Sequence, residues 1–174
     1  DSYYIYEHYA IFSIPNTWYV WVALILATDF VWYWYHRLGH EVNIFWAAHI
    51  VHHQSEEFNF TAAARITTLQ AIVRTAFWCL LPLAGFHPAM VITMLLIHGA
   101  YSFFTHTQAI GRIKWLEYVF ITPSLHGVHH ASDEKYLDKN YGDIFVFWDK
   151  MFGTFQVEEE HPKYGLTHPL KSYS

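Results

Sequence analysis

DFVWYWYHRLGHEVNIFWAAHIVHH, residues 29–53, contains five histidines in two closely spaced groups. His36 and His40 are four positions apart, and His49, His52 and His53 form an H-x-x-H-H group. In an α-helix, residues three and four positions apart share a face. This stretch therefore predicts helices that direct several imidazoles toward one shared site.

A second H-x-x-H-H group lies far downstream, and neutral histidine is the commonest protein ligand for metals. A structural zinc ion needs only four ligands. The clustered histidines exceed that number, so the pattern predicts two metal ions, each held by four or five nitrogens. The predicted ligands are His36, His40, His49, His52, His53, His106, His126, His129 and His130.

The type of ligand narrows the choice of metal. All-imidazole ligation suits zinc, iron, copper or nickel, and the histidine motifs contain few of the carboxylates that a hydrolytic metal pair would use. A nitrogen-rich pair of iron ions is typical of dioxygen activation. The predicted target is an aliphatic C–H bond of a lipid, which can reach the site from a membrane.

Two carboxylates near the first group are predicted to take part in catalysis. Asp29 lies seven residues, about two helical turns, before His36 and shares its face, while Glu41 directly follows His40. Metal-bound imidazoles need their second nitrogen held, so Asp29 is expected to support His36. Asp138 and Asp143 are either further supports or solvated loop charges.

The remaining histidines lack spaced partners. His8, His87, His161 and His168 are predicted to be structural residues, and the role of His98 stays open.

The composition excludes some functions and favours a membrane location. The net charge is −5, so there is no basic footprint for nucleic acid, and the single Cys79 excludes an intrachain disulfide. Aromatic residues make up 20% of the chain and charged residues 14%. Residues 18–35 form an apolar run that approaches the roughly 30 Å of a hydrocarbon core. We interpret it as a membrane helix, with a buried core helix as the alternative.

Two later apolar segments, 62–85 and 88–105, are joined by GFHP and predict a helical hairpin that either spans the membrane or dips into one leaflet. If the first arm spans fully, Arg74 lies at an unfavourable depth and must either snorkel to the interface or find a partner. A shallow hairpin would ease that cost. The hairpin returns residues 106–174 to the side of residues 42–54, which are expected to form a short surface helix. Aromatics including Trp32, Phe77, Phe103 and Phe104 are expected either to line an apolar cleft to the metals or merely to fill the core or face lipid.

The predicted fold is an all-α, integral-membrane helical bundle with a His-rich cytoplasmic cap of short helices. Residues 1–174 are expected to form a single domain, and the abrupt start indicates a segment of a longer chain. The cytoplasmic assignment follows from the Lys and Arg residues, which lie mostly in the cap.

The motifs DFVWYWYHRLGHEVNIFWAAHIVHH, FFTHT, LEYVFITPSLHGVHH, WDKMFGTFQ and YGLTHP resemble those of the fatty acid hydroxylase/sterol desaturase superfamily, and most closely its alkylglycerol monooxygenase branch. The resemblance implies two iron ions held by the nine histidines on the cytoplasmic face, with Glu41 also matching the family pattern. It further implies dioxygen as oxidant, a lipid substrate, and electrons from tetrahydrobiopterin or from a redox partner.

Three functions stay open at this point. The first is a membrane di-iron oxygenase that hydroxylates or desaturates a lipid, such as the ether-adjacent carbon of an alkylglycerol. The second is a sterol or carotenoid hydroxylase or desaturase of the same superfamily. The third is a metal-binding membrane protein without redox chemistry.

Overall fold

The computed structural model describes residues 1–168, and this part of the chain consists of helices and loops without a β-strand, which confirms the all-α prediction. Two isolated bridges, Phe120 with Phe145 and Ala131 with Tyr164, fasten loops to one another. The α-helices are α1 Ser2–Tyr9, α2 Trp18–Glu41, α3 Asn43–His53, α4 Phe60–Ala63, α5 Thr68–Trp78, α6 Leu80–Ala84, α7 Pro88–Thr105, α8 Pro123–His129 and α9 Phe147–Phe152.

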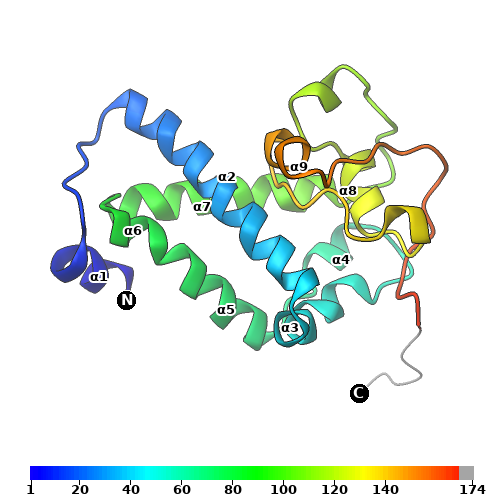
Figure 1. Cartoon of the computed structure of the whole chain (residues 1–174), viewed down its shortest axis with the longest axis horizontal. Coiled ribbons are helices and arrows are strands. Elements are labelled where there is room, and N and C mark those ends of the chain that lie inside the picture. The colour runs from blue at the N-terminus through cyan, green and yellow to red at the C-terminus, as the bar shows by residue number, and fades with distance from the viewer. Residues whose placement is uncertain (169–174) are drawn as a thin grey trace.

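The helices form two connected parts (Figure 1). The apolar block consists of α1, α5, α6, α7 and the first half of α2, and the cap consists of α3, α4, α8, α9 and their loops. Helix α2 crosses α7 and carries its last turns into the cap. The core of the apolar block contains Val20, Leu24, Trp78, Leu81, Met90, Val91 and Met94.

Helix α2 links the two parts without a break. It runs from Trp18 to Glu41, so His36 and His40 lie on the same continuous helix as the apolar run that precedes them. After Val42 the chain turns at once into α3, Asn43–His53, which confirms a helix within residues 42–54. The two histidine groups of residues 29–53 are therefore positioned by one rigid corner.

The expected single helix over residues 62–85 is wrong, because this arm consists of α4, α5 and α6. Thr67 causes the break: its hydroxyl accepts from the backbone N–H of Gln70 and donates to the carbonyl of Ala48 at 2.9 Å. The helix therefore restarts at residue 68 and is tied to α3. The hairpin turn before α7 is present, with Gly85 at a φ of 115° and the His87 ring accepting from the N–H of Ala89.

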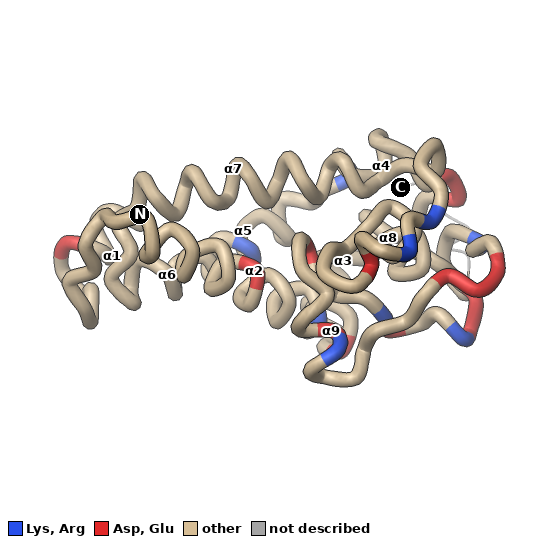
Figure 2. The backbone as a smooth tube through the Cα atoms, turned by 90° about the horizontal axis from the view of Figure 1, so that it is seen from above, with Lys and Arg blue, Asp and Glu red and all other residues tan. Residues whose placement is uncertain are grey.

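Charged residues lie mostly in the cap, whereas α7 has none (Figure 2). Among the helices of residues 1–168, α7 is the one whose length and composition would allow it to cross a bilayer, and α5 with α6 forms a shorter apolar stretch. The membrane bundle and its orientation stay predictions.

We predict that Gly85→Ala destabilises the protein by more than about 1 kcal/mol, since an L-residue is strained at this positive φ and its Cβ would overlap the carbonyl oxygen of Phe12. The measurement is the thermal unfolding midpoint in detergent. Gly99→Ala on α7 is the matched control, because a Cβ there meets no atom within 4 Å. Equal midpoints for the two variants would show that the close approach of Phe12 to Gly85 does not constrain the fold.

Candidate metal centre

The nine clustered histidines converge in the cap and separate into two groups. The five-histidine group contains His36, His40, His49, His53 and His129. The four-histidine group contains His52, His106, His126 and His130. Within each group, one nitrogen of every ring lies within 4.8 Å of the others. All nine rings are buried except that of His40, which is partly exposed.

The spacing of the H-x-x-H-H motif explains how one helix serves both groups. On α3, His49 and His53 are one turn apart and join the five-histidine group, while His52 points to the other group. On α8 the division is reversed, because His126 and His130 join the four-histidine group and His129 the other. The groups abut, with the rings of His53 and His130 stacked at 4.2 Å between centroids.

In the four-histidine group, two nitrogen lone pairs face each other. His52 Nδ1–H donates to the carbonyl of Ala62 at 3.2 Å, and His106 Nδ1–H donates to the carbonyl of Ser102 at 2.6 Å. A carbonyl oxygen can only accept, so a neutral ring with this bond carries a lone pair on Nε2. These two Nε2 atoms nevertheless lie 3.2 Å apart. The contact is repulsive unless a cation lies between them.

The five-histidine group shows the same crowding. Nε2 of His53 lies 3.1 Å from that of His49, 3.2 Å from that of His40 and 3.3 Å from that of His129. One ring nitrogen has at most one proton and cannot satisfy three contacts. Nitrogens that share a metal ion at about 2.1 Å lie about 3.0–3.4 Å apart in octahedral or tetrahedral geometry. The residues therefore fit a metal ion in each group.

Burial keeps these rings neutral, which is the form that binds metals. Desolvation lowers the pKa of His106 to about 4. Desolvation, reinforced by neighbouring imidazoles, also lowers the pKa of the α3 and α8 histidines well below the usual value: His49, His52, His53, His126, His129 and His130.

The second nitrogens of several rings are held by groups that sequence reasoning missed. His36 Nδ1 lies 2.9 Å from the carbonyl of Tyr141, and His129 Nδ1 lies 2.8 Å from that of Lys139. The amide of Gln70 lies 2.9 Å from His49 Nδ1, and its oxygen is buried without a partner. Turning this amide by 180° lets the oxygen accept from Nδ1–H and leaves the Nε2 lone pair of His49 for a metal.

The two predicted catalytic carboxylates form no hydrogen bond with any of the nine histidines. Glu41 is exposed and pairs with Arg37 at 2.7 Å. The prediction that Asp29 holds His36 is wrong, since the carbonyl of Tyr141 takes that place. Asp138 lies 3.8 Å from His40 Nδ1. The catalytic roles of Glu41 and Asp29 stay predictions.

Asp29 instead belongs to a third buried cluster, together with His98 and Asp143. Its carboxylate accepts from the backbone N–H groups of Ile144 and Phe145 and from Trp148 Nε1. His98 Nδ1 lies 2.7 Å from Asp143 and 3.7 Å from Asp29. The cluster ties α2 and α7 to the loop that contains Tyr141, so His98 and Asp29 support the site through the backbone.

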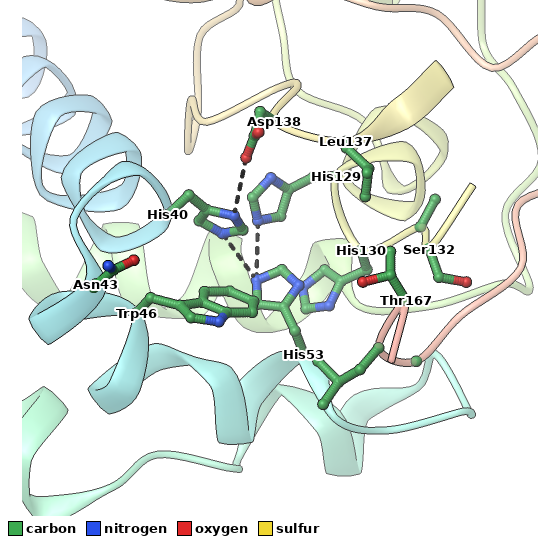
Figure 3. Close-up of a pocket in the computed structure, with 13 residues that line it drawn as sticks. His40, Asn43, Trp46, His53, His129, His130, Ser132, Leu137, Asp138 and Thr167 are labelled. Atoms are coloured by element: carbon green, nitrogen blue, oxygen red, sulfur yellow. Dashed lines mark hydrogen bonds and ion pairs between the residues drawn. The ribbon is translucent and has the colours of Figure 1, made fainter. Parts of the chain in front are cut away.

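The largest cavity beside the histidines has a volume of about 330 Å³ and opens onto the five-histidine group and onto His130 of the four-histidine group (Figure 3). His40, His53 and His129 point toward one another at its floor, with Trp46 beside His53 and Asp138 beyond His40. Its lining mixes polar residues with Leu137 and Leu166. A small polar molecule could thus approach the five-histidine group from the cap.

A second, smaller cavity of about 50 Å³ reaches the histidines from the hairpin and is lined by Trp32 and Arg74 among others. The predicted aromatic cleft is wrong in most of its residues. Phe103 and Phe104 are about half exposed, and Phe104 lines a separate apolar groove of about 300 Å³. Phe77 packs edge-on against Tyr35.

Comparison with known proteins identifies the family. A family model described as fatty acid hydroxylase matches residues 21–154, so the chain belongs to the fatty acid hydroxylase family.

The chain is 42% identical to human alkylglycerol monooxygenase over 173 residues, which cover 98% of this chain and 38% of that protein. It is 28% identical to the ornithine lipid hydroxylase of Rhizobium tropici, over 81% of this chain and 43% of that protein. Human cholesterol 25-hydroxylase is 24% identical, over 76% of this chain and 50% of that protein. The chain therefore spans half or less of the length of these relatives. No solved structure matches it significantly.

We predict that Gln70→Leu lowers metal affinity about 10–100-fold, because His49 loses the group that fixes its orientation. Metal content after dialysis against graded chelator measures the effect. Gln54→Leu, at the end of α3 and outside the hydrogen-bond network of the described residues, is the control and should retain the metal. Native retention by Gln70→Leu would exclude the orienting role.

Proposed function

We propose that this chain is the metal-binding part of a membrane-bound, non-haem di-iron oxygenase that hydroxylates an aliphatic C–H bond of a lipid. The facing lone pairs of His52 and His106 carry the proposal, since they need a cation between them. Family membership supports a hydroxylase, and the relatives named above are monooxygenases and hydroxylases of lipids.

Each histidine group would hold one iron ion, and the pair would supply the reductive activation of dioxygen that an aliphatic C–H bond requires. The overall reaction takes R–H, dioxygen, two electrons and two protons to R–OH and water. The protein's own contribution is orientation. Four of the rings donate their Nδ1–H groups to backbone carbonyls and so keep their Nε2 lone pairs directed inward. The four carbonyls are those of Ala62, Ser102, Lys139 and Tyr141.

The favoured substrate is an alkylglycerol, hydroxylated at the carbon beside the ether oxygen. The high identity to alkylglycerol monooxygenase over nearly the whole chain supports this choice. A sterol hydroxylase is the second candidate, supported by the weaker similarity to cholesterol 25-hydroxylase.

The apolar block would be embedded in the membrane, and the cap would lie on its cytoplasmic face. Residues 75–111 carry no charged side chain, and most Lys and Arg residues belong to the cap. This arrangement would let a lipid approach along the hairpin.

Electrons would come from tetrahydrobiopterin or from an electron-transfer partner. The cavity of about 330 Å³ beside Trp46 has the size of a small-molecule site and lies on the cap side. It is the candidate place for such a donor.

We predict that His52→Ala and His129→Ala each abolish more than nine-tenths of the activity, since residues of one site act as a unit. His161→Ala, with an exposed side chain, is the control and should be nearly silent. The assay combines iron content per chain with oxygen-dependent lipid products of the full-length protein in membranes.

Two irons per chain without an oxygen-dependent product would favour a non-redox metal-binding protein. Half of the activity retained in both variants would falsify the shared site. A sterol product in place of a cleaved or hydroxylated alkylglycerol would select the second candidate.

A further inference from the structure

The side chains of Arg65 and Arg74 form no hydrogen bond or ion pair with the groups of residues 1–168, and of these two arginines only Arg74 is partly buried, since Arg65 is exposed. Arg37 pairs with Glu41 at 2.7 Å and Arg112 with Glu117 at 2.8 Å. Arg74 lies on α5 within the apolar hairpin, only partly exposed. A guanidinium in such surroundings is unfavourable until an acceptor reaches it.

The position of Arg74 connects it to the metal centre. Gln70, which contacts His49, lies one helical turn earlier on the same face of α5. Both residues line the cavity of about 50 Å³. The histidines that line it belong to both groups, namely His36, His49, His52 and His126. The guanidinium thus shares one small space with potential ligands of both metals.

The size of this cavity limits what can enter it. A water molecule needs roughly 10–15 Å³ of such volume, so about 50 Å³ holds only a few heavy atoms. A carbon with its neighbouring oxygen-bearing group fits, whereas a hydrocarbon chain does not. The chain would lie outside, against exposed apolar residues of α5 such as Leu69 and Ile72.

We propose that Arg74 binds the oxygen-bearing head of the lipid substrate and thereby holds the adjacent carbon at the two histidine groups. An arginine offers five N–H donors and no acceptor, so its ligand must supply oxygen atoms, either hydroxyl or phosphate. The inference rests on the proposed lipid oxygenase function and assigns the specificity-determining contact. The same oxygens could also come from bilayer phospholipids, and the experiment separates the two sources.

The test uses full-length, iron-loaded protein in phosphatidylcholine nanodiscs. Two radiolabelled probes are compared: hexadecylglycerol, and an alkyl ether of equal length that lacks both hydroxyls. Direct binding is measured together with KM and kcat for Arg74→Gln and Arg74→Lys. Arg65→Gln is the matched control, because Arg65 is an exposed arginine of the same arm that does not line the cavity.

Arg74→Gln should weaken hexadecylglycerol binding about tenfold or more, the effect of losing a hydrogen bond from a charged donor. Its affinity for the ether without hydroxyls and its iron content should be unchanged. Arg74→Lys should fall between Arg74→Gln and the native protein, and Arg65→Gln should match the native protein. Native binding by Arg74→Gln, or equal losses for both probes, would overturn the assignment, as would failure of the native protein to bind hexadecylglycerol.

Repeating the measurement in dodecyl maltoside, which has no phosphate, separates the two sources of oxygen. If Arg74→Gln still binds hexadecylglycerol more weakly than the native protein in this detergent, Arg74 contacts the substrate itself. If the two proteins then bind it equally, Arg74 interacts with bilayer phosphates and the proposal is overturned. Failure of the proposed function has a different signature: the native protein would bind the probes without forming any oxygen-dependent product.

Discussion

The repulsion between neutral imidazole lone pairs is the constraint on which the cap depends. Nine histidines crowd into two groups with Nε2 atoms as close as 3.1 Å, and hydrogen bonds on the outer nitrogens prevent several rings from relieving that crowding with a proton. Without a cation, this repulsion would push α2, α3 and α8 apart. Three features oppose that separation: the short α2–α3 corner, the hydrogen bond from Thr67 to Ala48, and the Asp29–His98–Asp143 cluster. A bound cation would turn this strain into binding energy, since folding and metal binding are coupled in such sites.

The local part of this site could be predicted from the sequence, because histidine spacing and helix geometry are both short-range properties. His36 with His40, and His49 with His53, share helix faces in the structure as their spacing indicates. The division of each H-x-x-H-H motif between two groups also follows from helix geometry, since adjacent residues diverge by about 100° around a helix of 3.6 residues per turn. The long apolar runs and the helical spacing of the histidines were likewise sufficient to predict an all-helical fold.

The contacts that orient the rings could not be predicted in the same way. Four of them are backbone carbonyls of Ala62, Ser102, Lys139 and Tyr141, and a carbonyl has no signature in a sequence. Asp29 illustrates the limit. Its position on the helix predicted a contact with His36, but its carboxylate instead accepts a hydrogen bond from the backbone N–H of Ile144, 115 residues further along the chain. The break at Thr67 has the same origin, because its partner is the distant carbonyl of Ala48.

Two cavities on different sides of the histidines indicate a division of access in the proposed oxygenase. The large cavity reaches His40, His53, His129 and His130 from the cap, whereas the small one reaches His36, His49, His52 and His126 from the hairpin. A donor of electrons and a lipid could then occupy their sites together without competing. The small cavity excludes most water, which matters because uncoupled reduction of dioxygen would otherwise compete with C–H hydroxylation. Arg74 lines this small cavity, where little water is available to accept hydrogen bonds from its guanidinium. It would therefore favour a substrate whose own oxygen atoms accept those hydrogen bonds.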